Sequence, residues 1–442
     1  MKSDYIKSRR SFLKNSSLIT AGYFLLPSCT ITKKGTVANK YFVSPELSEE
    51  MYAKALAIAK SKVRGGPNDP VYKQPYVDAA FNSNIFYWDT CFIACYAKYH
   101  QDELPIINAL NNFYNLMEAD GFICREYTKE GTPMWPKDHP VSVNPPLLAF
   151  AELELYTVHQ NKQRLIEVYP KLHRHFNYLL TTYRCSDGLF INDALGSGMD
   201  NIERFPRGWK DDGQGIPLHN LHPELFNYDW PSSKWNKQGR MVDISAQMVL
   251  FARQLNEIAS IIQVTEHSNS YLQFIHDTTE AINKHCWNEA DAFYYDLGYG
   301  KQIPRKHIGM FWTLMAGAVP KEKLERFLAH LTNPDEFWRT IPIATLSADD
   351  PDYSGNGHYW RGSVWLPTNY MILRGLKQYN KTELANKLAK QYYWAVSKVY
   401  EATGTFWENY APDHLTKGSD SRPDFCGWTA VVPITIYREF IK

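Results

Sequence analysis

Residues 88–100, WDTCFIACYAKYH, form the stretch that decides the fold. Apolar and small residues occupy every face of a helix drawn through it, so this helix would be buried nearly all round. Other segments are amphipathic: PELSEEMYAKALAIAKSKV, at 45–63, has apolar residues at helical spacing behind a Ser-Pro-Glu start. A mixture of fully apolar and amphipathic helices is typical of two concentric rings, in which outer helices surround inner ones.

Helical patterns recur along the rest of the chain, separated by polar or aromatic loops. Sustained β alternation is nearly absent, and only GFICREYT (121–128) and AFYYDLG (292–298) suit small hairpins. No GxGxxG before a helix, P-loop or GxSxG motif is present. Further helices are predicted at 104–117, 145–159, 164–183, 243–263, 270–287, 309–319, 321–332, 368–379, 382–402 and 428–441.

We therefore expect an all-α domain over residues 45–442, an (α/α)6 toroid of six helical hairpins with small β-hairpin insertions. Loops at one rim of the toroid would build a pocket. An irregular all-α domain and a helical repeat solenoid are the alternatives, although no repeat of fixed period is visible.

The composition is that of an ordinary globular protein, with 442 residues, 44% hydrophobic and 21% charged. A formal net charge of +1 gives no sign of a nucleic-acid partner. Aromatic residues make up 14% of the chain, including 13 Trp and 29 Tyr. They serve either as large core side chains or as platforms on which sugar rings stack, and composition does not separate the two.

The first 29 residues resemble a twin-arginine export signal. Arg9 and Arg10 precede an apolar run that is too short and too interrupted to span a bilayer. LPSC resembles a lipoprotein cleavage box in which Cys29 takes the lipid, and residues 30–44 resemble a tether. We expect export to the periplasm or cell surface, with membrane contact only through this lipid anchor. A disordered amphipathic tail is the alternative.

The seven cysteines form no paired CxxC set, and the chain has no HExxH motif. We therefore predict neither a metal site nor a cofactor. A disulfide is permitted by an oxidising compartment but is not implied.

Five clusters of polar or aromatic residues stand outside the helical pattern, and four of them place a charged residue beside Trp or Tyr. Exposed loops need no such aromatics, and cores do not tolerate an unpaired charge. A rim pocket for a polyhydroxylated ring uses both. The clusters are FYWDT (86–90), GSGMDN (196–201), the loop with NYDW and VDIS (227–245), YWRGSVW (359–365) and TFWENY (405–410).

Cleavage of a glycosidic bond requires one carboxylic acid to protonate the departing oxygen. A second, ionised carboxylate activates water or attacks the anomeric carbon. Asp200, in a Gly-rich loop, and Glu408, in TFWENY, are the candidates. Apolar neighbours such as Met199 and Trp407 would raise a carboxyl pKa by desolvation, as the acid requires.

SGMDN, YWRGSVWLPTNY, TFWENY and FCGWTA occur in this order, and with them the chain resembles glycoside hydrolase family 63. The resemblance covers roughly residues 80–440. The family includes processing α-glucosidases and mannosylglycerate and glucosylglycerate hydrolases, and it is related to trehalases. The resemblance implies an (α/α)6 barrel and inversion of the anomeric configuration. It makes residues 45–442 the catalytic domain, Asp200 the general acid and Glu408 the general base.

The same resemblance assigns residues to substrate binding. Trp88 and Asp89 match the segment that holds the non-reducing sugar, although Asp89 is alternatively a buried ion-pair partner. The YWR segment at 359–361 matches a second wall of that subsite. Asp243 is either a helix N-cap or a sugar ligand. The other predicted sugar contacts are Asn144, Asn201, Trp209, Tyr359, Trp360, Arg361, Trp365, Trp407 and Trp428.

Four departures from the family's pattern alter the loops around the predicted pocket and therefore concern substrate identity more than reaction type. The 196–242 loop is also long, and we expect it to form a lid or a wall for the leaving group. The departures are Gly196 for Glu, Ile202-Glu203 for Ser-Pro, Asn144 for Gln and Ser363 for Pro.

The sequence therefore predicts an inverting, exo-acting α-glycosidase for α-glucosides or mannosides of oligosaccharides. The first alternative is a sugar epimerase or polysaccharide lyase on the same scaffold. An epimerase would need a histidine pair, and a lyase for acidic sugars would favour a basic cleft. The second alternative is a non-catalytic, glycan-binding surface lipoprotein, which loss of either carboxylate would indicate; both are present.

Overall fold

The computed structural model describes residues 40–79, 82–204 and 239–442. The predicted export signal, most of the tether and most of the 196–242 loop, with Trp209, lie outside the described residues. All elements below belong to the unit of residues 41–442.

The described chain is mostly helical, as predicted from the sequence. The longer helices are α1 (Pro45–Ser61), α2 (Tyr87–Ala97), α3 (Ile106–Leu116), α4 (Leu148–His159), α5 (Lys162–Tyr183), α7 (Val242–Ile262), α8 (Ser268–Ala281), α10 (Lys321–Leu331), α11 (Leu366–Gln378) and α12 (Thr382–Thr403). The last helix is the π-helix η5 (Val431–Ile441). The shorter helices are η1 (Pro140–Ser142), η3 (Ile282–Cys286), η4 (Ile308–Phe311), α9 (Trp312–Met315) and α13 (Cys426–Thr429).

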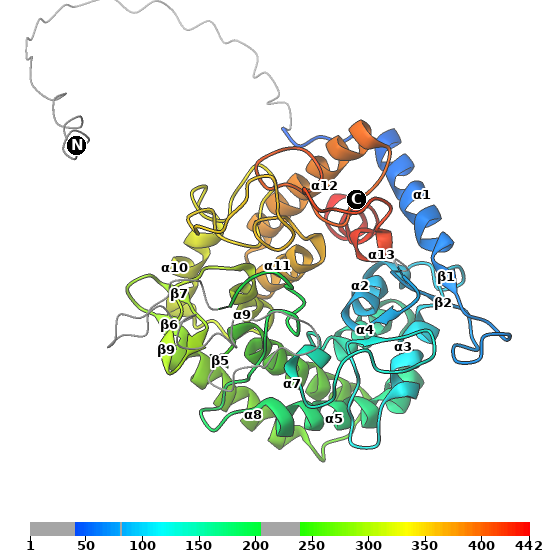
Figure 1. The fold of residues 1–442 in the computed structure, drawn as a ribbon, viewed down its shortest axis with the longest axis vertical. Coiled ribbons are helices and arrows are strands. Elements are labelled where there is room, and N and C mark those ends of the chain that lie inside the picture. Colours follow the sequence, from blue (N-terminus) through cyan, green and yellow to red (C-terminus); the bar gives the residue numbers. More distant parts are fainter. Residues whose placement is uncertain (1–39, 80–81, 205–238) are drawn as a thin grey trace, which may run out of the picture. The chain divides into compact units, whose positions relative to one another are not determined.

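Six helices of the described chain form a closed series of contacts (Figure 1). Helix α2 packs on α4, α4 on α7, α7 on α9, α9 on α11, α11 on η5, and η5 returns to α2. Helices α1, α3, α5, α8 and α12 each pack against one or more members of this series. We call α2, α4, α7, α9, α11 and η5 the inner series.

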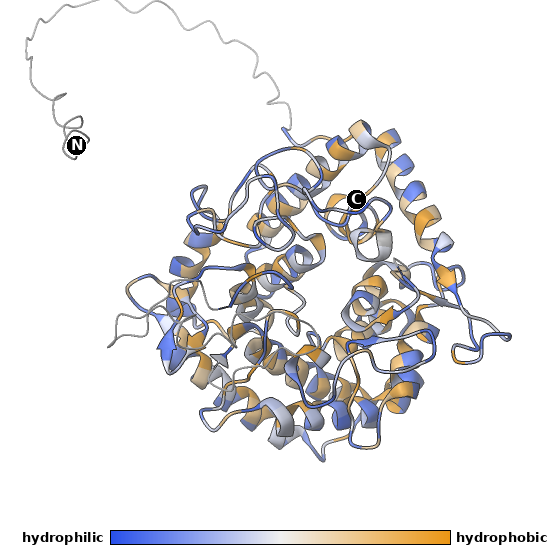
Figure 2. Cartoon of the chain, viewed as in Figure 1, coloured by the Kyte–Doolittle hydropathy of each residue, from blue (hydrophilic) through white to orange (hydrophobic). Residues whose placement is uncertain are grey.

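The burial of each helix follows its sequence pattern. Every residue of α2 is buried, as its uniformly apolar sequence predicts. Helix α10 instead buries Leu324, Phe327, Leu328 and Leu331, which form one stripe at helical spacing. Figure 2 shows the same division, with hydrophobic residues on the helix faces that meet other helices and hydrophilic residues toward the outer edge.

Ion pairs bring the C-terminal ends of several inner helices together. Lys98, just after α2, bonds Glu154 near the end of α4 at 2.6 Å and Glu439 near the end of η5 at 2.9 Å. Arg374, near the end of α11, bonds Glu154 at 2.7 Å. These inner helices therefore run in the same direction, and their N-terminal ends gather at the other end.

The strands are two residues long and form small antiparallel sheets. GFICREYT does not make the local hairpin predicted for it, because only β4 lies in it and pairs with the distant β3. AFYYDLG supplies β7 and β8, which belong to two successive hairpins. The strands are β1 (Val63–Arg64), β2 (Tyr76–Val77), β3 (Ile85–Phe86), β4 (Glu126–Tyr127), β5 (Gly239–Arg240), β6 (Trp287–Asn288), β7 (Phe293–Tyr294), β8 (Leu297–Gly298) and β9 (Lys301–Gln302).

The helix predicted at 309–319 is shorter than expected. It is divided between η4 and the single turn of α9, and the chain turns at Gly317, whose φ is +66°. Among the described residues, no helix combines the length and apolar character required to cross a membrane.

Candidate active site

The predicted site residues gather at the N-terminal ends of the inner helices. Asp89 lies in the first turn of α2 and Asp243 in the first turn of α7. Asn144 precedes α4, and Trp365 is the N-cap residue of α11. Residues far apart in the sequence therefore meet at one end of the inner series.

Asp200 lies in a tight loop built by its own backbone and side chains. The Asp193 carboxylate accepts a hydrogen bond from the Gly196 amide at 2.6 Å, and the Gly198 amide donates to the Leu195 carbonyl at 3.0 Å. Gly198 has a φ of +76° and lies directly on the indole of Trp88. The loop can approach α2 this closely only because position 198 has no side chain.

The Asp200 carboxyl is partly open to solvent and partly enclosed. Its side chain is 31% exposed, but Oδ1 is buried and lies 3.6 Å from Nη2 of Arg125. Desolvation raises the pKa of Asp200 to about 6, against the opposing charge of Arg125. A carboxyl with this pKa keeps its proton up to about pH 6, well above the range of an ordinary aspartate.

Glu408 is more deeply enclosed, with 4% exposure. Its backbone amide donates to the Arg422 carbonyl at 3.0 Å, while Oε2 is buried without a hydrogen bond among the described residues. Burial raises the pKa of Glu408 to about 7; Arg422 opposes the shift and the charge of Asp200 adds to it. The two predicted carboxylates therefore act on each other electrostatically.

Tyr359 and Asp89 belong to the same site. Burial raises the pKa of Tyr359 well above its usual value, and the charges of Asp200, Glu408 and Asp89 add to the shift. The pKa of Asp89 is also raised well above its usual value, chiefly by burial, with Arg125 opposing. Asp89 makes no ion pair with another described residue. The structure therefore does not support the alternative of a structural ion-pair partner.

Four of the predicted tryptophans pack against one another behind these polar groups. Trp360 stacks on Trp365 with ring centroids 4.1 Å apart, and Trp428 packs edge-on against Trp88 at 5.2 Å and Trp365 at 5.3 Å. All four rings are at most 4% exposed. They form an aromatic wall whose large faces are used in core packing.

Asn201 and Arg361 join the Asp200 loop to the 358–361 turn. The Asn201 side chain accepts from the Trp360 amide at 2.8 Å and donates to the His358 carbonyl at 3.0 Å. Arg361 donates to the Asn201 carbonyl at 2.8 Å and to Glu203 at 3.2 Å. These contacts give both residues a clear part in placing Asp200, while their predicted sugar contacts stay predictions.

Asp243 is not the N-cap that its sequence context favoured. Met241 is the N-cap residue of α7, and Asp243 lies within the first turn, where it is fully buried and forms an ion pair with Arg204. The helix end is satisfied instead by Asp296, which accepts from the Val242 amide at 2.8 Å. A sugar could not reach Asp243 without displacing this ion pair.

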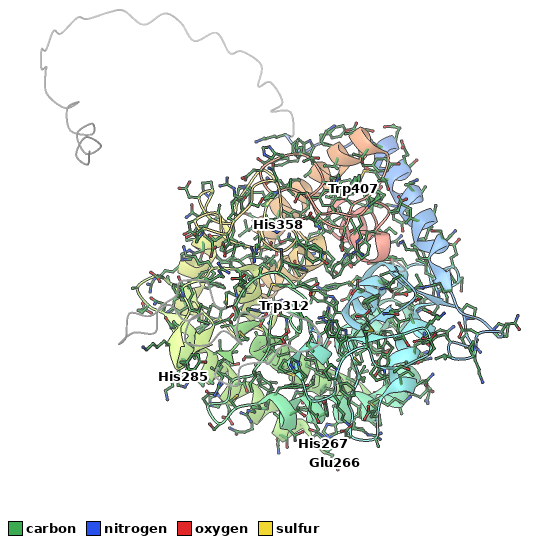
Figure 3. All side chains as sticks on the ribbon, viewed as in Figure 1. Glu266, His267, His285, Trp312, His358 and Trp407 are labelled. Atoms are coloured by element: carbon green, nitrogen blue, oxygen red, sulfur yellow. The ribbon has the colours of Figure 1, made fainter. Side chains whose placement is uncertain are left out.

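The other predicted contacts differ in position. Asn144 is buried, and its Nδ2 has no hydrogen bond among the described residues, so a donor is available beside α4. Trp407 lies by the end of α12, where its Nε1 donates to Thr403 at 3.1 Å and Lys417 lies 4.8 Å from its ring (Figure 3). Trp209 lies outside the described residues.

Two of the sequence departures have a steric or electrostatic explanation. A side chain at Gly196 would overlap the Pro140 carbonyl and the Asn192 side chain, so the loop as built excludes the family's glutamate. Glu203 pairs with Arg361, a contact that the family's proline could not make.

Arg125 and Arg422 act on the site electrostatically but were not identified from the sequence. Arg125 also donates to the Leu195 carbonyl and lies 5.2 Å from the ring of Trp135. Its signal was an Arg-Glu pair inside the otherwise apolar stretch GFICREYT. Arg422 follows the Glu408 segment in an irregular region, where no sequence pattern indicates which residues pair.

No group of His, Cys, Asp and Glu within residues 40–79, 82–204 and 239–442 is arranged to hold a metal ion. An epimerase would need a histidine pair, and the sequence places three histidines in loops at the predicted rim: His219, His222 and His358. His219 and His222 lie outside the described residues. His358 is exposed and pairs with Asp420 at 2.8 Å. His267 and His285 lie at the periphery in Figure 3.

Gly198→Ala is expected to lower turnover about 100-fold, because a methyl group at position 198 would push the Asp200 loop off Trp88. Steady-state rates measure the effect. Gly300→Ala is the matched control: Gly300 has a similar φ of +75° but no atom within 4 Å of the added carbon. Equal losses in both variants would show that backbone strain, and not the contact with Trp88, is responsible.

Comparison with known proteins finds a matching glycoside hydrolase family and related glycosidases. The model of the mannosylglycerate hydrolase MGH1-like glycoside hydrolase domain matches residues 82–425. A probable mannosyl-oligosaccharide glucosidase of Schizosaccharomyces pombe is 26% identical over 78% of this chain and 48% of its own length. A mannosylglycerate hydrolase of Rubrobacter radiotolerans is 28% identical over 42% of this chain and 41% of its own. The chain thus spans about half the length of the first of these relatives.

Solved structures show the same fold. The family 63 mannosylglycerate hydrolase of Thermus thermophilus, in complex with glucose, aligns with a TM-score of 0.66 at 18% identity, over 87% of this chain and 99% of its own. The neutral trehalase of Saccharomyces cerevisiae aligns with a TM-score of 0.57 at 13% identity, over 85% and 76%. Because the family model covers most of the chain, this protein belongs to the mannosylglycerate hydrolase MGH1-like family of glycoside hydrolases, within family 63.

Proposed function

We propose that the protein is an inverting, exo-acting α-glycosidase that releases glucose, or alternatively mannose, from α-linked oligosaccharides. The observation that carries the proposal is the pair of carboxyls with raised pKa values, Asp200 and Glu408, held at the N-terminal ends of the inner helices. We assign the inner series and the helices around it to an (α/α)6 toroid. The closed order of contacts supports this assignment.

In the proposed mechanism, Glu408 takes a proton from a water molecule as that water attacks the anomeric carbon. Asp200 gives its proton to the glycosidic oxygen, which leaves with the rest of the saccharide. One bond forms from water to the sugar and one breaks to the leaving group, so the configuration inverts. Inversion requires the two carboxyls to be roughly 6.5–9.5 Å apart, which leaves room for the water.

The neighbouring groups suit the sugar in this mechanism. Asp89 offers a buried acceptor for hydroxyl groups, Tyr359 a phenol that feels the charge of both carboxyls, and Asn144 an amide donor. We propose exo action because the ion pairs of Lys98 and Arg374 join inner helices at the end opposite the carboxyls, which supports entry of the saccharide from the carboxyl end.

A panel of α-linked glucosides and mannosides, including di- and trisaccharides and mannosylglycerate, tests the substrate class. The proposal expects release of a single terminal sugar, fastest from an α-glucoside. Release of an unsaturated product that absorbs in the ultraviolet would indicate a lyase, and epimerised sugar without cleavage would indicate an epimerase. Either result would contradict the proposal.

The pH profile of kcat/KM is expected to be bell-shaped, with limbs near pH 6 and 7. Below the lower limb both carboxyls are protonated and no base remains; above the upper limb both are ionised and no acid remains. Activity should fall about tenfold for each pH unit beyond either limb. Initial rates from pH 4 to 9 measure this, and a flat profile across that range would contradict the pairing.

The order of the two pKa values adds a feature to this profile. Because the pKa of Glu408 lies above that of Asp200, a single shared proton favours Glu408 in the unliganded protein. The productive arrangement, with the proton on Asp200, is then the minor one. A glycosidic oxygen bound beside Asp200 would favour the productive arrangement.

We also propose that the chain is exported and anchored through a lipid on Cys29, that its substrate is the saccharide and that it uses no cofactor. The leader and the LPSC sequence support this. The protein is expected in the membrane fraction, and Cys29→Ala is expected to move it to the soluble fraction, as immunoblots of both fractions would measure. A wild-type protein found wholly in the soluble fraction would contradict the anchor.

A further inference from the structure

Arg204 lies four residues after Asp200 and carries a buried charge that the mechanism does not use. Its side chain is 3% exposed. The guanidinium donates to two carboxylates on different elements: Nη2 to Asp243 in α7, and Nη1 to Asp296 Oδ2 just before β8, at 2.8 Å. A planar guanidinium that bonds two fixed carboxylates holds one orientation.

Both carboxylates are themselves held in place. Asp243 Oδ1 accepts from the Ile244 amide at 2.8 Å, and Asp296 Oδ1 caps α7 through the Val242 amide. Nδ1 of His307 accepts from the Gly309 amide at 3.2 Å. The proton of the neutral imidazole is therefore on Nε2, which donates to Asp296 Oδ2 at 3.1 Å. Asp243 and Asp296 therefore fix Arg204 against an inner helix, and His307 helps to orient Asp296.

The buried ion pairs of Arg204 are better explained by a role in positioning than by a gain in stability. Buried ion pairs often contribute no more stability than apolar side chains of the same volume, because the charges lose their hydration. What the network does provide is a fixed distance between α7 and the segment that carries Asp200. Arg361, through the Asn201 carbonyl, and Arg305, through the Glu203 carbonyl, attach the same segment to loops.

We infer that Arg204 is a positioning residue, which fixes the Asp200 loop to α7 so that the acid meets the glycosidic oxygen. The inference rests on the proposed function, since it assigns Asp200 as the proton donor. A purely structural role would affect all substrates alike. A positioning role lowers the hydrolysis rate most for substrates whose leaving group must be protonated by Asp200.

Arg204→Lys tests the inference, because lysine keeps the charge but cannot bond both carboxylates in one plane. With an α-linked disaccharide, kcat is expected to fall about 100-fold, whereas KM changes less than about threefold. With α-glucosyl fluoride, whose leaving group needs little protonation, kcat is expected to stay within about fivefold of wild type. Circular dichroism and thermal unfolding confirm that the variant is folded.

Arg164→Lys is the matched control. Arg164 is also largely buried and bonds Glu152 at 2.7 Å, but it lies on α5, away from the carboxyl pair. It should lower stability without changing the ratio of disaccharide to fluoride activity. Should Arg204→Lys fail to fold, Asp243→Asn weakens the same network with less disturbance and is expected to show the same substrate dependence.

Equal losses on both substrates, or unchanged kcat on the disaccharide, would overturn the inference. The comparison with Asp200→Asn separates this failure from failure of the proposed function. If Asp200→Asn loses the disaccharide and retains the fluoride while the network variants do not discriminate, only the role of Arg204 is wrong. If Asp200→Asn itself fails to discriminate, the assignment of the acid is wrong.

Discussion

Glu408→Gln is expected to lower turnover about 10⁴-fold on every substrate, including α-glucosyl fluoride. Glutamine has nearly the same size and fits the buried position, but it cannot take a proton from water. No leaving group can compensate, because the lost step is the activation of the nucleophile. Initial rates with the disaccharide and the fluoride measure the effect, and recovery of fluoride hydrolysis would show that Glu408 is not the base.

The same variant is expected to be more stable than wild type at pH 8. The folded-state pKa of Glu408 is raised from 4.5 to about 7, so its contribution to stability is full below pH 4.5 and is lost as the pH rises through 7. Glutamine avoids the ionised, buried state and gains up to about 3 kcal/mol at pH 8. Thermal unfolding at pH 4 and 8 is the measurement. A folded variant that is more stable and inactive separates loss of chemistry from loss of structure.

Asp200→Asn is expected to lower disaccharide hydrolysis about 10³-fold, because asparagine cannot protonate the departing oxygen. Its effect should differ from that of Glu408→Gln in its dependence on the leaving group. Hydrolysis of α-glucosyl fluoride should stay within about tenfold of wild type, since fluoride departs with little help from an acid. The upper limb of the pH profile, which reports loss of the acid's proton, should also be absent from the residual disaccharide activity.

The conservative variant Asp193→Asn serves as a control for Asp200→Asn. Asp193 shapes the loop through the Gly196 amide, and asparagine can still accept that hydrogen bond. It should therefore change rates less than about tenfold on both substrates. Similar losses from Asp193→Asn and Asp200→Asn would assign the effect to loop structure and contradict the acid role of Asp200.

The sequence predicted the helical architecture because burial leaves a local signal. Most of the largely apolar stretch at 88–100 forms α2, whose residues are all buried, and the apolar stripe of the amphipathic helix α10 forms its buried face. The helix predicted at 309–319 ends early, and the chain turns at Gly317, whose φ is positive. Hydrophobic spacing alone does not reveal such a position, so the prediction was too long.

The two carboxyls of the candidate site were also predictable, since each stands in a motif where apolar packing does not explain a charge. The pairing of charges that are far apart in the sequence was not predictable. The sequence shows that Asp243 opens a helix, but it does not show that Arg204 and Asp296 complete a buried network there. Nor could the sequence show that four tryptophan rings pack against one another.

The anomer released first is the most direct measure of the central claim, that Asp200 and Glu408 cleave an α-glycoside with a water between them. ¹H NMR spectra recorded within the first minutes of hydrolysis, before mutarotation, distinguish the two anomers. Inversion predicts that the β-anomer appears first from an α-linked substrate. Initial release of the α-anomer would mean retention, and would contradict direct attack by a water that Glu408 activates.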